Sequence, residues 1–249
     1  MKARHRIGWT SVALTVALAA TSGEGRVGQT AGGAAEAVAA LKQSLQQSQA
    51  NLRKYEWVET TIISFKGEEK SRKQQRCSYG ADGTLQKLPL AAEPAAPTGQ
   101  PQGRGRRGGR LKEKVVENKK SEMQEYMQRA AALIHSYVPP NPADIEKAKA
   151  AGRVAVRPGQ GGQARVEFAE FLKPGDMLAL GVDGAASRLT ELSVASYLDE
   201  KDDAVTLAVR FGTLADGTSY AEQTILDAPA KHIRVVVENA GHRRAEQQR

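Results

Sequence analysis

The stretch Arg188–Phe211, "RLTELSVASYLDEKDDAVTLAVRF", decides the fold class of this chain. Apolar and polar residues alternate on both sides of the charged group "DEKDD" at Asp199–Asp203. Alternation with a period of two is typical of a strand that has one face buried. The stretch therefore predicts two antiparallel strands, Leu189–Leu198 and Ala204–Phe211, joined by a charged hairpin turn.

The same pattern continues on both sides of this hairpin. Asp-Gly and Pro-Gly pairs, which favour tight turns, separate further short runs rich in β-branched residues. The remaining strands predicted in this half of the chain are Val154–Arg157, Gln163–Phe171, Met177–Val182, Ser219–Leu226 and Ile233–Glu238. Seven short strands divided by turn signals indicate a meandering antiparallel sheet.

The first half of the chain mixes helices with a few strands. Apolar residues at helical spacing predict a helix over residues 35–55, and a second helical pattern begins at Leu111 and ends before Pro139-Pro140. A third helix is predicted with Asn141 as its N-cap, Pro142 at its first position and Gly152 after its end. Three strands lie between the first two helices, at residues 55–66, 69–79 and up to Leu88. Helices and strands are thus segregated, which predicts an α+β fold.

The N-terminus has the pattern of a secretory signal peptide. Lys2, Arg4 and Arg6 precede an apolar run from Ile7 to Ala20, and Ala17 and Ala19 form an A-x-A pattern near its end. The run is shorter than the ~20 residues that a spanning helix needs. An uncleaved N-terminal anchor is the alternative. We therefore predict that the protein is exported to the periplasm or secreted.

The chain divides into four parts by composition. We predict a signal peptide at 1–19, a disordered linker at 20–34, one α+β domain at 35–240, and a flexible tail at 241–249. A disordered basic loop at 90–110 interrupts the domain. It contains prolines, glycines and four arginines, and only Leu90 is large and apolar.

Positive charge is concentrated in one segment of the chain. Residues 66–120 hold 14 Lys/Arg against 6 Asp/Glu, so the entire net charge of +8 lies there. Aromatic residues make up only 5% of the chain, which disfavours stacking on nucleic-acid bases. We predict no specific nucleic-acid partner. The alternatives are a solvated linker and a contact with an anionic membrane surface through Arg104, Arg106, Arg107 and Arg110.

The last strands, "SRLTELSVASYLDEKDDAVTLAVRFGTLADGTSYAEQTILDAPAKHIRVVVENAGHRR", together with the N-terminal helix and "YEWVETTIISFKGEE", carry a family resemblance. In element order they resemble the lipoprotein-carrier-like (LolA/LolB-like) superfamily of exported bacterial proteins. The resemblance implies a long curved antiparallel sheet, or half-barrel, with helices packed on its concave face. It also implies that this face holds acyl chains or another apolar ligand. The loop at 90–110 departs from the family pattern.

An apolar concavity of this kind is expected to draw on inward strand residues and on one helix face. The same residues are also what an ordinary filled core would use, and the sequence does not separate the two. The candidates are Trp57, Ile63, Phe65, Met123, Met127, Leu133, Ile134, Phe168 and Phe171.

Catalytic and metal-binding patterns are not found in the sequence. The histidines do not share metal-ligand spacing with one another or with Cys77, and we predict no metal, no cofactor and no catalytic residue. Cys77 is the only cysteine, so it is either a buried thiol or, with basic neighbours lowering its pKa, a nucleophile. The carboxylates of "DEKDD" are either a solvated hairpin tip or an incidental cation site.

Three functions remain compatible with the sequence. The first is an exported, non-enzymatic, monomeric binding protein for lipid, lipoprotein acyl chains or another apolar ligand. The second is an envelope-surface or polyanion-binding module that acts through residues 66–120. The third is an exported hydrolase whose Ser-His-Asp groups meet only in space. The sequence favours the first.

Overall fold

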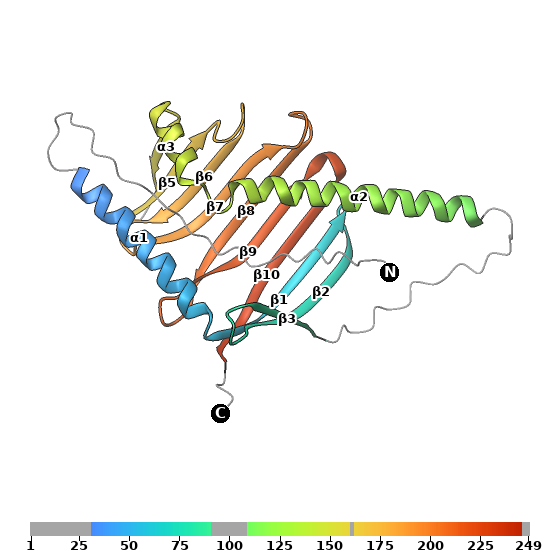
Figure 1. Ribbon diagram of the computed structural model, residues 1–249, viewed down its shortest axis with the longest axis horizontal. Coiled ribbons are helices and arrows are strands. Elements are labelled where there is room, and N and C mark those ends of the chain that lie inside the picture. Colours follow the sequence, from blue (N-terminus) through green and yellow to red (C-terminus); the bar gives the residue numbers. More distant parts are fainter. Residues whose placement is uncertain (1–30, 91–108, 160–161, 246–249) are drawn as a thin grey trace.

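The computed structural model describes residues 31–90, 109–159 and 162–245 (Figure 1). The predicted signal peptide, most of the basic loop, and the residues from 246 onward lie outside these ranges. Arg104, Arg106 and Arg107 are among the residues outside them, whereas Arg110 lies in the first turn of a helix.

The described chain is built on one antiparallel sheet of ten strands, in the order β3-β2-β1-β10-β9-β8-β7-β6-β5-β4 (Figure 1). Strands that follow one another in the sequence pair with each other except β3 and β4, and the pairing of β1 with β10 joins the two halves of the chain. The sheet is open and curved, with β3 and β4 at its edges. The strands are β1 (Tyr55–Phe65), β2 (Glu68–Tyr79), β3 (Leu85–Pro89), β4 (Val154–Pro158), β5 (Gln163–Ala169), β6 (Met177–Asp183), β7 (Arg188–Tyr197), β8 (Ala204–Thr213), β9 (Ser219–Ala228) and β10 (Ile233–Arg244).

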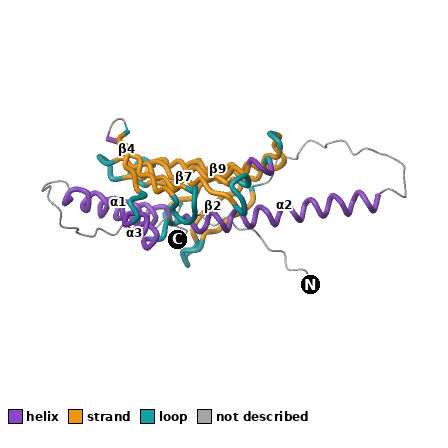
Figure 2. The backbone as a smooth tube through the Cα atoms, turned by 90° about the horizontal axis from the view of Figure 1, so that it is seen from above, coloured by secondary structure: helices purple, strands orange, loops and turns teal. Residues whose placement is uncertain are grey.

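The helices α1 (Ala31–Leu52), α2 (Gly109–Tyr137) and α3 (Pro142–Ala150) all lie on the same side of the sheet (Figure 2). The short turn η2 (Pro229–Lys231) joins β9 to β10. The side chain of Asn141 accepts a hydrogen bond from the Ala143 N–H at 3.0 Å, which confirms its role as N-cap of α3. The predicted α+β class, with a curved antiparallel sheet and helices on one face, is confirmed.

Three predicted boundaries need correction. The linker predicted at 20–34 ends earlier, because α1 already begins at Ala31. The predicted basic loop ends earlier as well, because α2 begins at Gly109. The tail predicted at 241–249 begins too soon, since β10 continues to Arg244. Gly241 has a φ of 66°, and at this point β10 shifts its register against β1, which keeps a polar segment paired in the sheet.

The hydrophobic core lies between the helices and the sheet. Alternate residues of β6 to β10 point toward the helices, and the side chains of α1 and α2 close the layer from the other side. Tyr137, Leu178 and Val205 in this layer have no exposed surface. The core thus occupies the face that the sequence resemblance assigns to an apolar ligand.

Candidate functional site

The half of the sheet that runs from β5 to β8 is filled by its own side chains. Phe168 is 1% exposed and packs edge-on against Phe171, with ring centroids 5.8 Å apart. Ile134 of α2 belongs to the same buried cluster. Three of the predicted ligand residues are therefore brought together here, as parts of a packed core.

A buried polar cluster fixes the C-terminal end of α2 to this half. The Tyr137 hydroxyl donates to the Asp176 carboxylate at 2.5 Å and lies 2.8 Å from the Ser196 hydroxyl. Burial, together with the Asp176 contact, raises the pKa of Tyr137 well above its ordinary value. Asp176 also accepts hydrogen bonds from the backbone N–H groups of residues 171–173. These contacts end β5 at Ala169, two residues before the predicted boundary.

The acidic turn between β7 and β8 holds the middle of α2. The Tyr126 hydroxyl donates to Asp203 at 2.8 Å, and Arg129 forms an ion pair with Asp199 at 2.5 Å. The "DEKDD" group, predicted to be a solvated tip or a cation site, thus supplies two carboxylates that position the helix. The ammonium of Lys231, in η2, lies 5.5 Å from the centre of the Tyr126 ring. Tyr126 is therefore placed over the turn between β9 and β10.

Beyond Tyr126, α2 continues over β10 and β1 (Figure 1), where the apolar cover is incomplete. Phe65, Met123 and Met127 are only partly buried against the core, and Ile63 is 40% exposed. Ile63 pairs with Val235, which is a core residue, so both side chains lie on the helix-facing side. We call Ile63, Phe65, Met123 and Met127 the apolar margin. Leu133, the remaining predicted residue of α2, is partly buried against the core.

Trp57 lies at the other end of β1, six residues before Ile63. Its indole N–H donates to Asn239 at 3.0 Å, and the Asn239 amide donates to the Ala221 carbonyl. The Trp57 ring stacks on His242 with 5.6 Å between centroids. Trp57 is thus part of a polar and aromatic cluster, and the structure does not bring it to the apolar margin.

Sequence reasoning missed an ion pair on the helix-facing side of β1 and β3. Both carboxylate oxygens of Glu59 lie 2.7 Å from the Lys87 ammonium, and the two side chains are 9% and 19% exposed. The sequence signal that could have revealed this ion pair was the hairpin turn at Asp82-Gly83. Its register places Lys87 opposite Cys77, and Cys77 is paired with Trp57 on the next strand. This end of the helix-facing surface is therefore polar.

Cys77 lies beside this ion pair and has no exposed surface. Burial, and then the negative charge of Glu59, raise the pKa of the Cys77 thiol to about 11. Arg76, the basic residue next to Cys77 in the sequence, does not lower its pKa, because adjacent side chains of a strand point to opposite faces. The buried-thiol alternative agrees with this environment.

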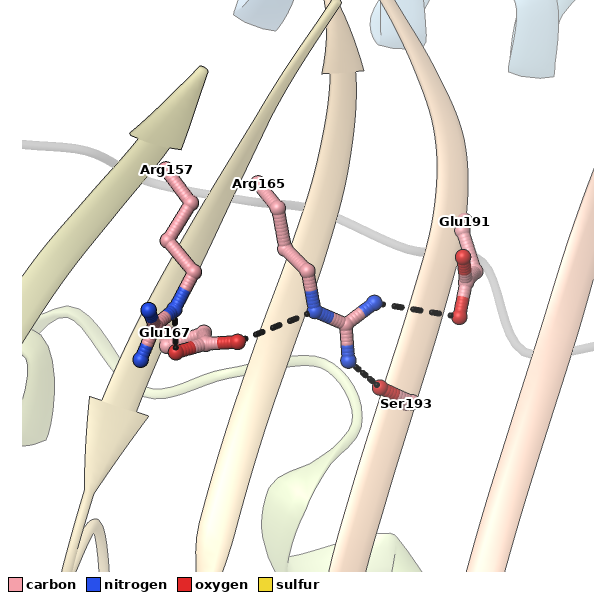
Figure 3. A network of polar contacts seen from close by, with 5 residues as sticks. All are labelled: Arg157, Arg165, Glu167, Glu191 and Ser193. Atoms are coloured by element: carbon pink, nitrogen blue, oxygen red, sulfur yellow. Dashed lines mark hydrogen bonds and ion pairs between the residues drawn. The ribbon is translucent and has the colours of Figure 1, made fainter. Parts of the chain in front are cut away.

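On the face of the sheet that carries no helices, charged side chains cover the part from β4 to β7. Arg165 lies 3.2 Å from Glu167 and 3.3 Å from Glu191, and it donates to the Ser193 hydroxyl, as Figure 3 shows. Arg157 forms a further ion pair with Glu167 at 2.7 Å and, as the largest contribution, lowers the pKa of that carboxyl. The pairs alternate in sign across β4 to β7 and keep this part of the face solvated.

The described surface includes a hollow near each end of β1. A hollow of about 280 Å³ is lined by Glu56, Trp57, Val58, Arg76, Gly241 and Arg243. A larger hollow of about 660 Å³ lies where the turn after β1 meets the turn before β10, and it is lined by residues that include Lys66, Asp227, His232 and Arg234. Of the predicted ligand residues, Trp57 lines the first hollow and none lines the second.

Membrane-spanning helices and metal-binding groups are two further features that can be assessed within the described ranges. Within residues 31–90, 109–159 and 162–245, none of the helices combines the length and the apolarity that crossing a bilayer requires. The side chains described in these ranges contain no group of three or more His, Cys, Asp or Glu residues placed to hold a metal ion.

Comparison with known proteins finds similarity in structure only. No protein-family model matches the chain, and no curated protein sequence matches it. The structure is similar to that of a DUF1329 family protein from Desulfovibrio piger, with a TM-score of 0.36 and 8% identity over 85% of this chain and 94% of that one. It is also similar to a LolA superfamily protein from Nitrosomonas europaea, with a TM-score of 0.32 and 8% identity over 81% of this chain and 93% of that one.

Proposed function

We propose that this protein is an exported, non-enzymatic binding protein that takes an apolar chain at the apolar margin. The observation that carries the proposal is the unequal cover of one continuous apolar layer. The layer is closed over Phe168, but its margin leaves Ile63 40% exposed, with Phe65 and the two methionines only partly buried. Methionine side chains adapt to irregular apolar partners, which suits a flexible ligand.

The opposite face of the sheet supports the same assignment. Its ion pairs keep the part from β4 to β7 solvated, so that part offers no apolar surface to a ligand. The apolar margin continues the core directly, since Ile63 lies opposite Val235 and Phe65 lies opposite Ile233. An acyl chain placed there would extend the existing apolar layer. Export through the predicted signal peptide is part of the proposal.

Nile red, a neutral dye whose fluorescence rises in apolar surroundings, tests this proposal. We expect the full chain, purified after any leader processing, to bind the dye. Replacing an exposed apolar side chain in the site with a carboxylate should weaken binding by about tenfold, or ~1.4 kcal/mol. The test variant is Ile63→Asp, and the matched control is Leu88→Asp on β3, where the side chain is 60% exposed. Equal affinity in the two variants, or no dye binding by the wild type, would overturn the proposal.

A second function is favoured by the exposed positive charge on β2. Lys70, Arg72 and Lys73 are exposed there, and they belong to the segment 66–120 that holds the net charge of the chain. We propose contact with an anionic membrane surface through this segment. Binding to vesicles of anionic lipid should weaken as salt is added, and it should be lost when residues 99–114 are deleted. Binding that salt and the deletion leave unchanged would exclude this function.

A further inference from the structure

The helix-free face of the sheet carries an apolar row beside its charged part. The register of β8, β9, β10 and β1 aligns four side chains across the strands. They are Ala208, Ile225, Val236 and Ile62. Their neighbours along the strands, such as Leu226 and Val235, are core residues, so the row points to the face opposite the core. We call these four residues the apolar strip.

The apolar strip interrupts the usual pattern of a sheet with one wet face. Ala208 is exposed, and the three larger side chains are half-buried although none of the described helices lies over them. Antiparallel strands that face water on one side alternate apolar and polar residues. Here the strands instead have continuous apolar runs, which are Ile62-Ile63, Ile225-Leu226 and Val235-Val236-Val237. Such runs are typical of strands covered on both faces, so the strip predicts a cover.

Two polar rows border the apolar strip, and their charges balance. The rows are Thr206, Asp227, Arg234 and Ser64 on one side, and Arg210, Gln223, Glu238 and Thr60 on the other. Together they hold two arginines and two carboxylates, and so have no net charge. An anionic lipid surface attracts an excess of positive charge, which these rows lack. The apolar strip therefore favours a protein partner over a membrane.

The pairs between β9 and β10 indicate which protein fits this face. The pairs are Asp227 with Arg234, Ile225 with Val236, and Gln223 with Glu238. The first is an ion pair at 3.3 Å, and in the third the glutamine amide donates a hydrogen bond at 3.0 Å. A two-fold axis along the strands, between β9 and β10, places each member of a pair over its partner residue in a second copy. Matching groups then face each other in all three pairs.

We propose that the apolar strip is the interface of a homodimer in which two helix-free faces pack against each other about this axis. The occupant is a second copy, because the same surface on both subunits must be self-complementary, and this one is. Sheets packed face to face keep their strands within about 30° of each other, which agrees with an axis along the strands. The side chains of Arg234 and Asp227 are 51% and 35% exposed, so both can reach a second copy.

This inference does not depend on the proposed function, and it departs from the monomeric state predicted from the sequence. Sedimentation velocity of the full chain, purified after any leader processing, tests it over a range of protein concentrations. We expect a dimer that dissociates on dilution. Ile62→Asp buries a carboxylate in the interface and should weaken dimerisation by about tenfold or more, or ~1.4 kcal/mol. The matched control, Ile63→Asp, changes the adjacent isoleucine on the helix-facing side and should leave dimerisation unchanged.

A pair of charge variants keeps the test decisive if Ile62→Asp disturbs folding, which circular dichroism detects. Arg234→Glu places a carboxylate over Asp227 of the second copy and should weaken dimerisation. Adding Asp227→Arg exchanges the two charges and restores unlike pairs both within and between the copies. We therefore expect the double variant to dimerise again. A double variant that stays monomeric would overturn this arrangement.

The remaining outcomes separate the dimer from other interfaces and from the proposed function. A wild type that is monomeric at every concentration, or a dimer that Ile62→Asp leaves intact, would overturn the inference. Loss of the dimer in Ile63→Asp, or in Val156→Asp on the edge strand β4, would also overturn it, because the interface would then lie at the apolar margin or at the sheet edge. Nile red binding by the wild type is read separately, and its absence would remove the proposed function alone.

Discussion

The two halves of the helix-facing surface differ in how they are closed. From β5 to β8, Phe168, Phe171 and Tyr137 fill the space beneath the helices, and Asp176 satisfies the backbone of the adjoining turn. From β10 to β3, the same surface carries an exposed isoleucine, a partly buried phenylalanine and the Glu59–Lys87 ion pair. One continuous sheet thus has a packed half and an accessible half.

This difference indicates which half of the sheet stabilises the fold and which half is available for binding. A packed half stabilises the fold because each large side chain is removed from water by close neighbours. An accessible half contributes less, but it leaves room for a ligand that completes the layer. Changes in the packed half should therefore alter the free energy of unfolding, and changes in the accessible half should mainly alter binding.

The largest effect is expected from Phe168→Ala. Phe168 is 1% exposed, and truncation should leave a cavity that lowers the free energy of unfolding by about 3–5 kcal/mol. Ile63→Ala, on the accessible half, should lower it by less than ~1 kcal/mol because the side chain is 40% exposed. Urea unfolding followed by circular dichroism measures both values. Similar losses in the two variants would mean that the halves are packed alike.

Tyr137→Phe should have the next largest effect. The change removes the hydroxyl that lies 2.5 Å from Asp176 and 2.8 Å from Ser196, and it preserves the ring. Hydrogen bonds to charged groups are worth about 1.5–3 kcal/mol, so the free energy of unfolding should fall by that amount. Tyr197→Phe is the control, since its hydroxyl donates to the Pro174 carbonyl at an exposed position. An equal loss in both variants would show that the buried cluster does not anchor α2.

Most of the fold was predictable because the strand and turn signals are local. Alternation around "DEKDD" predicted β7 and β8, and the Asn141 cap and Pro142 predicted the start of α3. The extension of β10 to Arg244 was not predictable from hydropathy. It depends on a long-range partner, β1, whose Tyr55 lies opposite Arg244. Pairing between distant segments lets polar residues continue a strand that local pattern ends.

The residue types of the candidate site were predictable from the sequence, but which of these residues lie together in the structure was not. Phe168 and Ile63 both have the alternation of inward strand residues, yet one is buried and the other exposed. The difference arises from where α2 crosses the sheet, and that depends on Tyr126 and Arg129 reaching carboxylates at least 70 residues away. The hollow of about 660 Å³ likewise joins turns that are far apart in the sequence.

The reactivity of Cys77 is a finer probe of the accessible half. Burial and the charge of Glu59 raise its pKa to about 11, so the thiolate should be scarce at pH 8 and alkylation by iodoacetamide slow. Glu59→Gln removes a charge that raises the pKa and should speed alkylation severalfold. Lys87→Gln removes a charge that lowers the pKa and should slow it further. Mass spectrometry of the labelled chain measures the rates.

These alkylation rates can be compared only if local unfolding exposes Cys77 to the same extent in each variant. The free energy of unfolding, measured in urea for each variant, supplies that control. Acceleration in both variants would show that Cys77 reacts through local opening, and the half from β10 to β3 would then be less ordered than its ion pair indicates.

The smallest effect concerns His242, which connects the end of β10 to the accessible half. Its ring stacks on Trp57 and lies 4.1 Å from the Tyr220 ring centre, and burial lowers its pKa below the ordinary value. The folded state therefore disfavours protonation. The free energy of unfolding should therefore be highest above pH 6.5, the approximate pKa of His242 in the unfolded chain. It should decrease as the pH falls toward the lower pKa that His242 has in the folded chain, and it should not change further below that value.

Trp57 reports this titration, because it is the only tryptophan after the predicted signal peptide. A protonated imidazole stacked on the indole quenches its emission, so fluorescence should fall with a midpoint below pH 6.5. His242→Phe keeps a ring in the stack and should remove the transition. A midpoint at or above about 6.5 would mean that water or a carboxylate reaches His242, and that the accessible half extends along β10 to the end of the sheet.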